Sequence, residues 1–74
     1  MSEVLVDARG HRCPVPTLRL RRALERAAPG QTVRLLADDP LARIDVPHFV
    51  SGEGHRLISS TADGAILIFI VARQ

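Results

Sequence analysis

The sequence predicts an α+β fold, a two-layer α/β sandwich in which two helices cover one face of a mixed four-stranded sheet. Three observations predict it. Apolar residues change between strand and helix periods in the order βαβαββ. The chain has 74 residues, so residues 1–74 form a single domain. The last apolar run has no polar alternation, which indicates an interior strand, since an exposed apolar edge invites aggregation.

The first half of the chain predicts a strand, a helix and a second strand. A short apolar run at 4–6 is closed by Asp7 and a turn around Gly10. From 16 to 28 the apolar residues follow the helical period, and Pro29-Gly30 ends the pattern. Residues 32–37 are rich in β-formers. The helix therefore forms a right-handed crossover between the first two strands.

The second half predicts a shorter helix and a hairpin. Asp38 and Asp39 precede Pro40, which favours helix capping over a metal or acid/base pair. Pro47 makes one unbroken helix unfavourable, so we expect a turn at 41–43 and a short helix from Asp45 to 52 or 54. The remaining residues predict a hairpin with strands at 56–61 and 65–73.

Composition excludes several classes of protein. Ten arginines stand against eight acids, and a net charge of +2 with only two aromatic residues argues against direct nucleic-acid binding. The longest apolar run, 65–72, is far shorter than the roughly 20 residues of a membrane helix. Glu3 lies where a secretory signal would be basic. We expect a cytoplasmic monomer with no membrane contact, no cofactor and no metal site.

The residues with the clearest chemistry surround Cys13. It is the only cysteine, which excludes an internal disulfide, and it lies just before a helix N-terminus, where free N–H groups favour a thiolate. We predict an exposed thiol that is more acidic than usual. The alternative is an ordinary buried cysteine. The supporting residues are the cations Arg9, His11 and Arg12, the turn-forming Gly10, and the stiffening Pro14 and Pro16. For His11 the alternative is a solvated loop histidine.

The outer face of the first helix is a candidate docking surface. Val15, Leu18 and Arg22 have the spacing i, i+3, i+7, with Arg19 beside them. Mixed apolar and arginine surfaces suit transient interfaces. The alternative is a solvated helix face that carries an Arg21–Glu25 ion pair.

Four blocks in order, 6–16, 29–30, 37–40 and 44–49, resemble the TusA family of sulfur carriers, also called SirA-like proteins. The first block includes the Cys-Pro-x-Pro motif at 13–16. The resemblance implies a fold similar to the C-terminal domain of translation initiation factor 3, with strand order 1-2-4-3. This order agrees with an interior last strand.

The resemblance also implies a function. Cys13 would accept sulfane sulfur as a persulfide, from a cysteine desulfurase or a rhodanese-type donor, and pass it to an acceptor such as a DsrE-like protein. The sulfur would serve tRNA thiolation, molybdenum cofactor synthesis or sulfur oxidation. The chain departs from better-known members at His11, often leucine, and lacks the second cysteine that some carry near 49–51. The alternatives are a thiol redox regulator and a regulatory binding module without sulfur transfer.

Overall fold

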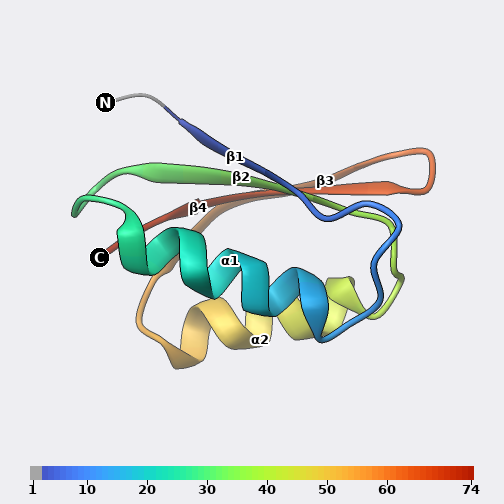
Figure 1. Ribbon diagram of the computed structural model, residues 1–74, viewed down its shortest axis with the longest axis horizontal. Helices are drawn as coiled ribbons and strands as arrows, with labels where there is room; N and C mark the ends of the chain where they lie inside the picture. The colour runs from blue at the N-terminus through green and yellow to red at the C-terminus, as the bar shows by residue number, and fades with distance from the viewer. Residues whose placement is uncertain (1–2) are drawn as a thin grey trace.

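The structure is a computed structural model that describes residues 3–74 of the chain. Two helices lie side by side on one face of a twisted sheet, and the other face is open (Figure 1). The elements in chain order are β1 (Val4–Asp7), α1 (Val15–Arg26), β2 (Thr32–Ala37), α2 (Ala42–Gly52), β3 (Arg56–Asp63) and β4 (Ile66–Ala72). The predicted two-layer α+β architecture is confirmed.

The sheet has the strand order β1-β2-β4-β3. β1 pairs with β2 in parallel, and the other two pairings are antiparallel. β4 is interior, as its continuous apolar run predicts: Phe69 lies between Leu35 of β2 and Ser60 of β3. β1 and β3 are the edges.

The core lies between the sheet and the helices. α1 contributes Leu20 and Leu24, and α2 contributes Val46 and Val50, all almost fully buried. The strands contribute the alternate residues that face the helices, because successive side chains of a strand point to opposite faces. These are Val6, Val33, Leu35, Ala37, Leu67, Phe69 and Val71.

α2 corrects the expected break near Pro47. The helix runs unbroken from Ala42 to Gly52 with Pro47 inside it. Pro47 has no N–H to donate to the carbonyl of Arg43. Arg43 is an exposed residue in the first turn of the helix, so water can replace the lost hydrogen bond. The expected turn at 41–43 and the expected helix start at Asp45 are therefore wrong: the turn lies at 40–41, where Ala42 N–H donates to Asp39 O at 2.9 Å, and the helix begins three residues earlier than expected.

Other boundaries differ from the expected ones by one or two residues. α1 begins at Val15 and ends at Arg26 because Ala27 has an extended backbone, with φ −76° and ψ 152°. β3 continues to Asp63, which moves the hairpin turn to Gly64 and Ala65. Neither of the helices described within residues 3–74 is long and apolar enough to cross a membrane.

Candidate functional site

Two carboxylates from the end of β2 hold the loop that carries Cys13. Both oxygens of Asp38 accept the Gly10 N–H, each at 3.0 Å. Asp39 Oδ2 accepts the Cys13 N–H at 2.8 Å. β1 and β2 are parallel neighbours, so their C-terminal ends lie at the same end of the sheet, and the loops that follow the two strands meet there. Gly10 makes the turn with φ +83°, a conformation that favours glycine.

Asp39 also organises the entry to α2. Its Oδ1 accepts the Leu41 N–H at 3.0 Å, so one carboxylate joins the cysteine loop to the turn that precedes the helix. The two N–H donors lower the pKa of Asp39, first through Cys13 and then through Leu41. The predicted helix capping by the two aspartates is wrong, because Leu41 is the N-cap residue of α2 and, among residues 3–74, no side chain caps that helix. Asp39 accepts the N–H of this N-cap residue, and Asp38 binds the cysteine loop.

The hydrogen bond from the Cys13 N–H to Asp39, the loop tether, predicts that the titration of Asp39 can be measured at the Cys13 amide. The amide resonance of Cys13 should shift with a midpoint below the ordinary aspartate value of about 3.9, because Asp39 is the group that titrates. Since the folded-state pKa is depressed, the tether stabilises the fold above about pH 3.9 and is lost as pH falls through the lower folded value. Nuclear magnetic resonance of the wild type and Asp39→Asn checks this. A midpoint at or above 3.9, or one that survives in Asp39→Asn, would contradict the assignment.

The thiol of Cys13 corrects the prediction of an exposed and acidic sulfur. The side chain is half-buried and packs against the hydrophobic core. Burial raises the pKa of Cys13 to about 11, helped by a hydrogen bond to the Asp45 carboxylate and by the negative charges of Asp45 and Asp39. The thiol is therefore protonated at neutral pH.

The cations that neighbour Cys13 in sequence are directed elsewhere. Arg9 donates from Nε and Nη2 to the two oxygens of Asp7, at 2.8 and 2.7 Å, and these bonds hold the pKa of Asp7 at about 2. The charge of Arg12 acts on Asp39, whose pKa it lowers. The prediction that Arg9 and Arg12 acidify the thiol is wrong, because sequence proximity did not place their guanidinium groups at the sulfur.

The remaining motif residues shape the loop. His11 is exposed and lines a hollow of about 350 Å³ with Gly10, Arg12, Asp38, Asp39 and Pro40. Pro14 occupies the N-cap position after a cis peptide bond from Cys13, and Pro16 is buried in the first turn of α1. Within residues 3–74, no group of three or more His, Cys, Asp or Glu side chains is arranged to hold a metal ion.

The predicted docking surface divides into two parts. Val15 and Leu18 are exposed by 37% and 51% beside the cysteine loop. Arg19 and Arg22 instead line a separate groove next to β1. The alternative Arg21–Glu25 pair is not formed: Arg21 bonds Glu53 of the loop after α2 at 3.1 Å and lies over the Phe49 ring.

Sequence reasoning missed the contribution of α2. Asp45, expected at the start of the second helix, is one of the groups that raise the pKa of the Cys13 thiol. Leu41 and Ile44 are exposed apolar residues at the start of the same helix, 55% and 70% accessible. No sequence periodicity relates these residues of α2 to Cys13. They come near Cys13 only because the two crossover connections bring both helix starts to one end of the sheet.

Comparisons with known proteins agree with this geometry. The family model described as sulfurtransferase TusA matches residues 4–73. The crystal structure of a SirA-like protein from Desulfitobacterium hafniense superimposes with a TM-score of 0.80 at 28% sequence identity, over 96% of this chain and 99% of the other. The family match spans both the cysteine loop and the two carboxylates that hold it, and the chain belongs to the TusA sulfurtransferase family.

Proposed function

We propose that the protein carries sulfane sulfur as a persulfide on Cys13 and passes it to an acceptor protein. The observation that supports this most is the placement of the only cysteine, on a loop fastened by Asp38 and Asp39 at the end of the sheet where both helices begin. A fixed thiol at the tip of a small domain can enter the active site of another protein.

The transfer conserves atoms and electrons. The Cys13 sulfur attacks the terminal sulfur of a donor persulfide, the donor S–S bond breaks, and the donor leaves as a thiolate that takes up the thiol proton. The acceptor thiolate then attacks the terminal sulfur on Cys13, and the Cys13 thiol is restored with a proton. Sulfane sulfur moves between thiols, and the two exchanges involve no external oxidant or reductant.

Apolar residues around the thiol support docking to proteins. Val15 and Leu18 on α1, with Leu41 at the N-cap of α2 and Ile44 in its first turn, are exposed at the end of the molecule that carries Cys13. We infer that a cysteine desulfurase or a rhodanese-type donor and a DsrE-like acceptor use this surface in turn. The reaction belongs in the cytoplasm, where thiols stay reduced, and the sulfur would serve tRNA thiolation, molybdenum cofactor synthesis or sulfur oxidation.

Mass spectrometry tests the proposal directly. The protein incubated with a cysteine desulfurase and cysteine should gain one sulfur atom, which a reductant removes and which Cys13→Ser does not acquire. The matched control is Ser51→Ala, an exposed residue on α2, which should load like the wild type. Absence of added sulfur with desulfurase, rhodanese and low-molecular-weight persulfide donors would refute the proposal. A mixed disulfide formed without added sulfur would favour a redox regulator instead.

A further inference from the structure

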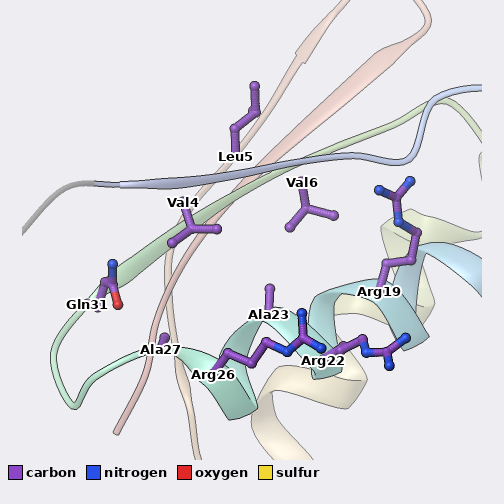
Figure 2. A pocket seen from close by; sticks show the side chains of 9 residues that line it. All are labelled: Val4, Leu5, Val6, Arg19, Arg22, Ala23, Arg26, Ala27 and Gln31. Carbon is purple, nitrogen blue, oxygen red and sulfur yellow. The ribbon is translucent and has the colours of Figure 1, made fainter.

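A groove separate from the cysteine loop runs between the edge strand β1 and α1 (Figure 2). Its volume is about 680 Å³. In Figure 2, Val4 and Val6 point from the strand toward α1, and Leu5 points to the opposite side. The lining residues are Val4, Leu5, Val6, Arg19, Arg22, Ala23, Arg26, Ala27 and Gln31. The groove thus combines an apolar base with three guanidinium groups.

Two of these arginines have no anionic partner in the described chain. Arg19, Arg22 and Arg26 are spaced i, i+3, i+7, so they project from one side of α1. Arg19 Nη1 donates to the main-chain oxygen of Asp7 at 2.6 Å. Within residues 3–74, Arg22 and Arg26 form no ion pair or hydrogen bond. Their positive charge is therefore available to a ligand.

The strand beside them has an open edge. Ala8 N–H donates to Leu36 O of β2 at 2.8 Å. Main-chain groups alternate in direction along a strand. The N–H and C=O groups of Val4 and Val6 therefore also point to β2, whereas those of Leu5 and Asp7 point outward from the sheet. Arg19 already occupies the outward oxygen of Asp7. The N–H and C=O of Leu5 remain directed outward from the edge of the sheet that β1 forms, beside the groove.

We propose that this groove binds an extended acidic segment of a partner protein, which adds to β1 as a further strand. Arg22 and Arg26 lie about 6 Å apart along the helix axis. Alternate side chains of a strand are about 6.6 Å apart, so carboxylates at every second position of the segment meet both arginines. The intervening side chains fall on the side of Leu5, which is 61% exposed, and apolar residues suit that position.

The same features favour a peptide over a nucleic acid. The lining has no aromatic side chain on which a base could stack, and the chain carries a net charge of only +2. The outward N–H and C=O of Leu5 match the main chain of a peptide, which no phosphate backbone reproduces. This binding does not use Cys13, so it stands independently of sulfur transfer.

Fluorescence anisotropy with the full chain and a labelled peptide of alternating Glu and Val tests the proposal. The wild type should bind it, and Arg22→Ala/Arg26→Ala should weaken binding about tenfold through loss of two charge-assisted contacts. Arg43→Ala/Arg56→Ala removes the same charge from exposed positions outside the groove and should change binding less than twofold. Cys13→Ser should bind like the wild type, whatever the outcome of sulfur loading.

A second variant tests the strand pairing. Leu5→Pro removes the outward N–H and leaves the β1–β2 ladder intact, so binding should also fall about tenfold. If this variant does not fold, the amide resonance of Leu5 in the wild type should shift on peptide addition. Equal weakening by both arginine pairs, equal binding of a peptide with its Glu residues in one block, an unmoved Leu5 resonance, or displacement of the peptide by single-stranded RNA would overturn the proposal.

Discussion

Replacing Asp45 by asparagine is expected to lower the pKa of the Cys13 thiol from about 11 by about one unit. The carboxylate raises the pKa in two ways, by accepting the thiol hydrogen bond and by repelling the thiolate charge, and the amide lacks the charge. The thiolate fraction at neutral pH should then rise about tenfold. Alkylation should accelerate by only about threefold, because a less basic thiolate is also a weaker nucleophile.

The pKa can be read from the ultraviolet absorbance of the thiolate, since the chain contains neither tryptophan nor tyrosine. Glu25→Gln is the matched control, because Glu25 is an exposed residue in the last turn of α1, at the opposite end of that helix from Cys13. It should leave the thiol pKa unchanged. An Asp45→Asn thiol that titrates as in the wild type would show that burial alone sets the value.

Phe69→Ala is expected to bring the domain close to global unfolding. Phe69 is 1% exposed on the interior strand β4 and belongs to the core between the sheet and the helices, so truncation leaves a cavity in that core. Such substitutions cost about 3–5 kcal/mol. A chain of 74 residues has a total stability of only roughly 4–11 kcal/mol.

Thermal unfolding followed by circular dichroism measures this loss. A decrease of about 3 kcal/mol lowers Tm by roughly 12–24 °C in a domain of this size. Leu18→Ala removes an apolar side chain that is half exposed and should change stability by less than about 0.5 kcal/mol. Phe69→Ala with a Tm within a few degrees of the wild type would mean that the core repacks around the cavity.

The fold was predictable because its signals are local. Strand and helix periods located every element, and the uninterrupted apolar run of β4 indicated an interior position. The exception is Pro47, because its effect depends on where the helix begins, and no local signal marks Ala42 as the first helical residue. Once Ala42 starts the helix, the proline costs a bond only at the exposed first turn.

The site was predictable only in part, because its chemistry is set by residues distant in sequence. Cys13 and its loop are recognisable from the motif, and Gly10 has the positive φ that its turn requires. Asp39 and Asp45 follow Cys13 by 26 and 32 residues, and only the sheet topology brings them to the thiol. Arg9 and Arg12 lie close to Cys13 in sequence but interact with Asp7 and Asp39, since proximity in sequence does not determine where a long side chain points.

The burial of the Cys13 thiol, together with the neighbouring Asp45 carboxylate, protects the resting protein from oxidation. At pH 7 a thiol with a pKa of about 11 is ionised in about one molecule in 10⁴, and oxidants attack thiolates far faster than thiols. Cys13 precedes α1 and Asp45 belongs to α2, so this protection depends on the two helix starts remaining side by side. A thiol in this state reacts slowly with peroxides and with small disulfides.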